Sequence, residues 1–162
     1  MISVKRWEIV TAIVLGLVMF LPFAQAETFF DITECGAGTV TLVYQSPEMT
    51  IAGQDGKGTI LSNHENKVLD NCTFHVVVIA QTADGKRRSE SYWKIMDPDG
   101  DIIIAEVHVV IPEKTMKFLY GTGKWKGIKG GAKGRGITTG KPVAPGTWQA
   151  CSRYTGTFEL PK

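Results

Sequence analysis

The stretch Ile102-Ile103-Ile104-Ala105-Glu106-Val107-His108-Val109-Val110-Ile111 decides the fold class. Side chains two apart in a β-strand share a face. One face of this stretch is wholly apolar and consists of Ile103, Ala105, Val107, Val109 and Ile111. The other face carries Glu106 and His108 among apolar residues. The pattern predicts a strand whose wholly apolar face points into a core.

Similar strand compositions recur outward from this stretch. Segments 39–44, 73–80 and 147–160 alternate in polarity or are rich in β-branched and aromatic residues. Only the polar segment 62–70 could hold a turn of helix, and no long segment shows a sustained helical period. Strands at short, regular spacing predict an all-β sandwich or barrel.

Three Asp-Gly pairs lie between strand-like segments. They are Asp55-Gly56, Asp84-Gly85 and Asp99-Gly100. Asp and Gly both tolerate a positive φ, so each pair predicts a hairpin turn. The eight glycines within 121–140 have neither dinucleotide-binding nor P-loop spacing, and they indicate strand bulges and bends instead.

Residues 1–26 have the pattern of a signal peptide. Lys5 and Arg6 precede an apolar run over 9–23, and Ala24-Gln25-Ala26 forms a small-x-small cleavage motif. An uncleaved N-terminal anchor is the alternative. Cleavage after Ala26 leaves a single domain over 27–162, in which no segment is apolar enough to span a membrane as a helix. We expect an exported protein, periplasmic or secreted.

Charge is unevenly distributed along the exported part. Segment 114–158 has nine basic residues and no acidic one, whereas segment 27–113 has fourteen acidic and six basic residues. An anionic partner at the basic segment is one interpretation. The other is that basic and acidic strands interleave as solvated outer faces. We expect no nucleic-acid partner.

Three segments together resemble a known group of proteins. They are 92–101 (YWKIMDPDGD), 121–131 (GTGKWKGIKGG) and 145–151 (PGTWQAC) followed by 156–161 (GTFELP). The chain is similar to small exported bacterial proteins, mostly uncharacterised, related to the allene oxide cyclase barrel and to dirigent proteins. The resemblance implies a closed, calycin-like antiparallel barrel of about eight strands. It implies no catalytic residue, since none matches by position.

Alternating carboxylates at Asp97, Asp99 and Asp101 suggest a calcium loop. That loop requires glycine at its sixth position and glutamate at its twelfth, which are Ile102 and His108 here. A Pro-Asp-Gly hairpin turn accounts for the segment instead. We therefore predict no metal site and no cofactor.

Two sets of residues are candidates for a site. Glu106 and His108 share a strand face and would form an acid–base pair if that face pointed inward, although the wholly apolar face is the one expected inside. Four aromatic residues could line a ligand cavity or fill the core: Tyr92, Trp93, Trp125 and Trp148.

The three cysteines allow one disulfide in an oxidising compartment. Alternate strands of an up-and-down barrel begin at the same end. On this strand count Cys35 and Cys72 lie at the starts of the first and third strands, and Cys151 lies near the opposite end. A disulfide needs Cα atoms within about 7 Å. We therefore predict a Cys35–Cys72 bridge with Cys151 free.

The expected function is non-enzymatic binding of a small apolar or amphiphilic ligand, or of a partner. One alternative is a cyclase- or isomerase-like enzyme that uses polar groups inside the barrel. Another is a structural or assembly role. An interior that is hollow rather than packed would favour ligand binding over the structural role.

Overall fold

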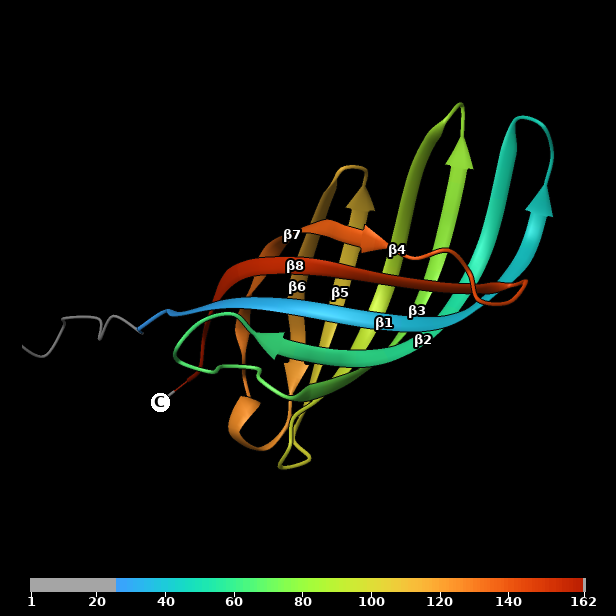
Figure 1. Ribbon diagram of the computed structural model, residues 1–162. Coiled ribbons are helices and arrows are strands. Elements are labelled where there is room, and N and C mark those ends of the chain that lie inside the picture. Colours follow the sequence, from blue (N-terminus) through green and yellow to red (C-terminus); the bar gives the residue numbers. More distant parts are fainter. Residues whose placement is uncertain (1–25, 162) are drawn as a thin grey trace, which may run out of the picture.

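The period-two segments form a closed antiparallel barrel of eight strands in the computed structural model, which describes residues 26–161 (Figure 1). The strands are β1 (Thr28–Gln45), β2 (Met49–Ser62), β3 (Cys72–Ala83), β4 (Lys86–Met96), β5 (Ile102–Val110), β6 (Glu113–Gly121), β7 (Lys129–Thr139) and β8 (Thr147–Glu159). Each strand pairs with the next, and β8 pairs with β1. The predicted all-β barrel is confirmed.

The N-terminal prediction lies almost entirely outside this part of the chain. Of the predicted signal peptide, only Ala26 is among the described residues. Within 26–161, no helix is long and apolar enough to cross a bilayer.

Alternation along the strands fills the barrel with apolar side chains. On β5, Ile103, Ala105 and Val107 are at most 1% exposed, so the wholly apolar face points inward as predicted. Phe30 and Ile32 on β1 and Phe158 on β8 join the same core. The short segment 62–70 forms turns rather than a helix, with positive φ at Lys67 and Leu69.

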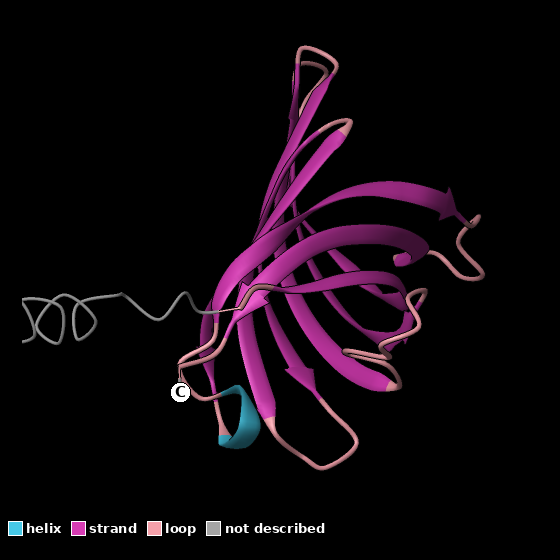
Figure 2. Cartoon of the chain, turned by 90° about the vertical axis from the view of Figure 1, so that its left-hand side faces the viewer, coloured by secondary structure: helices cyan, strands magenta, loops and turns pink. Residues whose placement is uncertain are grey.

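One end of the barrel is plugged by aromatic residues. The 3₁₀ turn η1 (Gly123–Trp125) lies at the same end as the β4–β5 turn (Figure 1). Its Trp125 packs edge-on against Phe158, with ring centroids 5.6 Å apart, and Phe30 lies beside Phe118 and Phe158. Figure 2 shows the strands spreading apart away from this end.

Two of the three Asp-Gly pairs form turns. Asp84-Gly85 joins β3 to β4, with φ of 50° and 71°, and Gly100 of the β4–β5 turn has φ 90°. The prediction was wrong for Asp55-Gly56, which lies within β2. A Cβ at Gly56 would come 2.2 Å from the ring of Trp148, so this glycine makes room for an aromatic side chain.

The disulfide joins Cys35 to Cys151, so the predicted Cys35–Cys72 pairing was wrong. Cys35 and Cys151 are direct partners in the β1–β8 ladder, with Cα atoms 4.1 Å apart. Cys72 is a buried free thiol on β3, separated from β1 by β2. Barrel closure places β1 beside β8, so Cys35 and Cys151 lie opposite each other. The prediction failed because it placed Cys151 at the opposite end of the barrel from Cys35.

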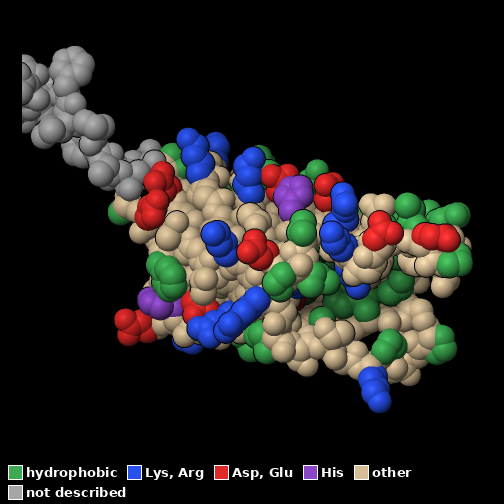
Figure 3. All heavy atoms as spheres, turned by 90° about the horizontal axis from the view of Figure 1, so that it is seen from above, with side chains coloured by type: hydrophobic (Ala, Val, Ile, Leu, Met, Phe, Trp, Pro, Cys, Tyr) green, Lys and Arg blue, Asp and Glu red, His purple; other side chains and the backbone are tan. Residues whose placement is uncertain are grey.

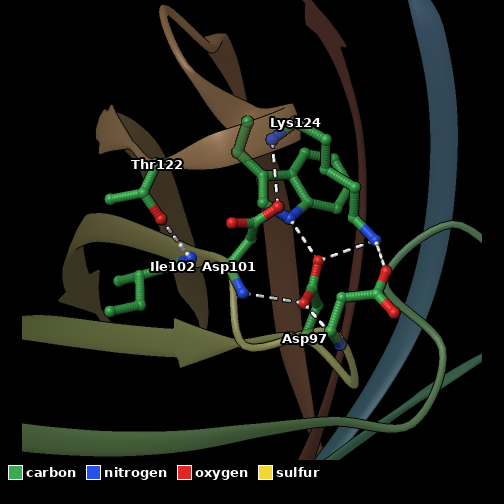
Figure 4. A network of polar contacts seen from close by, with 7 residues as sticks. Asp97, Asp101, Ile102, Thr122 and Lys124 are labelled. Carbon is green, nitrogen blue, oxygen red and sulfur yellow. Dashed lines mark hydrogen bonds and ion pairs between the residues drawn. The ribbon is translucent and has the colours of Figure 1, made fainter.

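The β4–β5 turn is organised by the buried carboxylate of Asp97 (Figure 4). One oxygen accepts the backbone N–H groups of Asp99 and Asp101 at 2.9 and 3.0 Å. The other accepts the indole N–H of Trp125 and the ammonium of Lys124, both at 2.8 Å. The network ties the turn to η1 and so holds the plugged end together.

These contacts also explain the Asp97–Asp101 pattern. Lys124 supplies the positive charge beside Asp97 and Asp99. No group of acidic, histidine or cysteine side chains within residues 26–161 could hold a metal ion. Burial raises the pKa of Asp97, but hydrogen bonds from Lys124, Trp125 and the Asp101 backbone outweigh it and hold the pKa below its ordinary value.

We predict that Asp97→Asn lowers the free energy of unfolding by about 1–3 kcal/mol, because an amide cannot accept all four donors. Because the folded pKa is depressed, the native contribution of Asp97 is present above the unfolded pKa and is lost as pH falls through the folded one. The variant should lack this acid sensitivity in urea unfolding. Asp99→Asn, which alters an exposed carboxylate, is the matched control and should change stability by less than about 1 kcal/mol. Equal effects of the two substitutions would contradict the role of Asp97.

Candidate functional site

The barrel is hollow away from its plugged end. A cavity of about 450 Å³ lies inside the strands and reaches the β5–β6 turn at Ile111 and Pro112. Its apolar wall consists of Val76, Val78, Trp93, Val107, Val109 and Trp148. Its polar lining includes Glu34, Gln54, Arg87, Ser89, Ser91, Lys114 and Ser152. We call this cavity the lumen.

Glycines opposite aromatic residues give the lumen its shape. Tyr154 on β8 lies over Gly134 of β7, where an added Cβ would come 2.3 Å from the ring. Phe74 likewise lies against Gly36 and Gly58. The glycine-rich segment therefore leaves bare backbone for rings to lie on, besides the bulge that it contributes at Gly136.

A polar cluster connects β6 to the β1–β8 pair across the inner side of β7, which lies between β6 and β8. Lys114 donates a hydrogen bond to the hydroxyl of Ser152, which is 1% exposed. Ser152 in turn hydrogen-bonds Glu34, its direct partner in the β1–β8 ladder. The cluster thus joins a cation and a carboxyl group through one serine.

Burial controls the charges of this cluster. It raises the pKa of Glu34 to about 7, and the Ser152 hydrogen bond and the Lys114 charge only partly oppose the shift. Burial also lowers the pKa of Lys114; Glu34 opposes this shift and Arg87 adds to it. The pKa of the neighbouring Tyr154 is raised by burial. Glu34 therefore changes its charge near neutral pH.

The two indole N–H groups of the lumen wall differ in their hydrogen bonding. The N–H of Trp93 donates to Ser91 at 3.0 Å, and Ser91 donates to the Val107 carbonyl. Trp93 stacks near Phe74, with ring centroids 4.6 Å apart. The buried N–H of Trp148 has no hydrogen-bond partner within the described part of the chain. A ligand acceptor could satisfy this donor.

The structure separates the four predicted aromatic residues. Trp93 and Trp148 line the lumen. Trp125 fills the plugged end, and Tyr92 is 62% exposed on the outer face. The aromatic side chains thus divide between lumen wall, core and surface.

The predicted acid–base pair lies outside the barrel. His108 is exposed, and its ring lies 3.9 Å from Glu106, which also pairs with Lys117 at 3.6 Å. The wholly apolar face of β5 points inward, so Glu106 and His108 do not reach the lumen.

The basic segment pairs with acidic residues from earlier strands and from the β4–β5 turn. Arg153 binds Asp31 of β1, Lys117 pairs with Glu106, and Lys124 pairs with Asp97 and Asp99. Figure 3 shows both signs of charge on one face of the molecule. An anionic partner at this segment stays a prediction.

Sequence reasoning missed Glu34, Lys114 and Ser152 as site residues. Glu34 shares a strand face with Phe30 and Ile32, and a charged residue on an apolar face is a usable signal. Lys114 and Ser152 gave no comparable signal. They meet because the closed barrel brings side chains of β6 and β8 together on its inner side, although β7 separates the two strands.

Comparisons with known proteins support the fold. No protein-family model and no curated protein matches the chain. Two similar solved structures are the pterocarpan synthase dirigent proteins GePTS1 and PsPTS1. GePTS1 has a TM-score of 0.53 and 14% identity over 89% of this chain and 96% of its own. PsPTS1 has a TM-score of 0.54 and 13% identity over 86% and 99%.

These values show a shared fold. The expected barrel fold, which dirigent proteins share, is confirmed. The finer likeness to allene oxide cyclase and to exported bacterial proteins stays a prediction. Chemically, the lumen can enclose an amphiphilic molecule, donate hydrogen bonds to its polar group and exchange a proton near neutral pH.

We predict that Glu34→Gln removes a pH dependence of stability. Because the folded pKa of Glu34 is about 7 and the unfolded value is about 4.3, its contribution is fully present at low pH and is lost as pH rises between these values. The variant should therefore gain stability relative to wild type at pH 8 but not at pH 4, as measured by urea unfolding. Glu106→Gln on the outer face is the control and should show no such gain. A similar pH profile for wild type and Glu34→Gln would sink this assignment.

Proposed function

We propose that the protein binds a small apolar or amphiphilic ligand in its lumen without transforming it. The hollow lumen is the observation that carries this proposal. Its volume of about 450 Å³ lies within the range of about 300–1,000 Å³ typical of ligand pockets. Valine and indole side chains form its wall, and a few polar groups could orient a ligand.

The same proposal places the protein in an exported, oxidising compartment. The Cys35–Cys151 disulfide supports this, because such bridges persist outside reducing compartments. The signal-peptide pattern over residues 1–26 points the same way.

Binding can be tested with N-phenyl-1-naphthylamine, an uncharged aromatic probe that fluoresces in apolar surroundings. We expect saturable binding to the wild-type protein. Val109→Trp would fill the lumen from its wall and should abolish the signal. Val110→Trp adds the same side chain at a 69% exposed position and should bind like wild type.

Circular dichroism and urea unfolding would verify that both variants fold. Absence of saturable binding in wild type would refute the proposal, as would equal binding by a folded Val109→Trp. Native mass spectrometry of protein purified from its own compartment adds an independent readout, in which a co-purified small molecule is expected.

A second candidate function is cyclase- or isomerase-like catalysis in the lumen. The observation that favours it is Glu34, a buried carboxyl group with a pKa of about 7 near Lys114. A group with a pKa near the working pH can both donate and accept a proton.

Catalysis of this kind would leave an isotopic mark. The co-purified ligand, incubated with the protein in deuterium oxide, should gain carbon-bound deuterium or change its retention in chromatography. Glu34→Gln should abolish either change, whereas Glu106→Gln should not. Recovery of unchanged, undeuterated ligand from wild type would reject catalysis and leave the binding proposal intact.

A further inference from the structure

The charged groups that face the lumen are mostly cations. They come from three strands: Glu34 on β1, Arg87 on β4 and Lys114 on β6. The lumen-lining residues of β2, β3, β5, β7 and β8 add no further charge, and Tyr154 of β8 is a neutral phenol whose pKa is raised. The lumen thus carries a net positive charge whether or not Glu34 is ionised.

Neither cation has an anionic partner within ion-pair distance among residues 26–161. Lys114 is partly buried, and its hydrogen bond goes to a neutral hydroxyl group. Arg87 lies near enough for its charge to lower the pKa of Lys114. Two like charges beside one cavity repel each other, and an anion between them would relieve that repulsion.

Other lumen groups are suited to the rest of such a ligand. Trp93 and Trp148 line the lumen with indole rings, and valines complete its apolar part. The unpartnered indole N–H of Trp148 is a further donor that an acceptor-only acid group could use.

We propose that the ligand of the lumen is a small aromatic organic acid whose anionic group binds between Lys114 and Arg87. This inference rests on the proposed function, ligand binding in the lumen, and names the class of ligand. The anion forms charge-assisted contacts with the half-buried ammonium of Lys114 and the exposed guanidinium of Arg87, and the aromatic part packs against the indole rings.

Glu34 makes this binding sensitive to pH. When ionised, its carboxylate competes with the ligand for Lys114 and repels the acid group. When protonated, it does neither. Its pKa of about 7 means that affinity for an anion should rise as pH falls from about 8 to 6. By linkage, ligand binding should be accompanied by proton uptake.

The test compares two probes with the same aromatic skeleton. 8-Anilinonaphthalene-1-sulfonate carries a permanent negative charge, and N-phenyl-1-naphthylamine carries none. We expect Lys114→Met to weaken sulfonate binding about ten-fold or more while changing affinity for the neutral probe less than two-fold. Arg87→Met should act in the same direction, and Arg88→Met, its neighbour in sequence, should have no effect.

The pH series separates the roles of Glu34 and Lys114. Wild type should bind the sulfonate more tightly at pH 6 than at pH 8, and Glu34→Gln should bind it equally at both. If Lys114 alone titrated, Glu34→Gln would keep the pH dependence, and the role of Glu34 would be overturned.

Failure of this inference is distinguishable from failure of the proposed function. If both probes bind wild type with equal affinity and neither cation substitution matters, the anion preference is refuted while ligand binding stands. If neither probe binds, or both still bind a folded Val109→Trp, the lumen is not a ligand site and both proposals fall.

Discussion

The pairing of β1 with β8 is the constraint on which the rest of the structure depends. Twelve residue pairs join these strands, and the disulfide links Cys35 to Cys151 within the same ladder. The adjacent pair in that ladder is Glu34 and Ser152. A slip of one residue would turn Glu34 out of the barrel and dissolve the polar cluster. The disulfide therefore fixes the strand register directly beside Glu34 and Ser152, whose positions in the lumen depend on that register.

The lumen exists because large and small residues face one another across the strands. Tyr154 lies over Gly134, and Trp148 lies over Gly56. Rings that rest on bare backbone occupy the wall rather than the centre. The plugged end is the opposite case, where Trp125, Phe158 and Phe30 pack together and Asp97 holds the β4–β5 turn to η1. One barrel thus combines a filled end with an open one.

The sequence anticipated some parts of this arrangement for sound physical reasons. Alternation in β5 predicted which face is buried, because a side chain's face depends only on its position along the strand. Turn chemistry was right at Asp84-Gly85, where a positive φ is needed. It was wrong at Asp55-Gly56, because Gly56 makes room for the ring of Trp148, a residue more than ninety positions away. The disulfide pairing failed for the same reason, since it depended on which strands became neighbours.

The sequence by itself determined that the chain forms an all-β sandwich or barrel, that β5 turns its apolar face inward, and that Asp97–Asp101 forms a turn. These properties arise from local alternation and turn preference. Only the tertiary structure decided that the barrel is hollow, that Cys35 pairs with Cys151, and that Glu34, Lys114 and Ser152 meet. Closure joins the two ends of the chain, and no local pattern records which residues then face each other. The charge of Glu34 near neutral pH is likewise a property of burial, which the strands create only together.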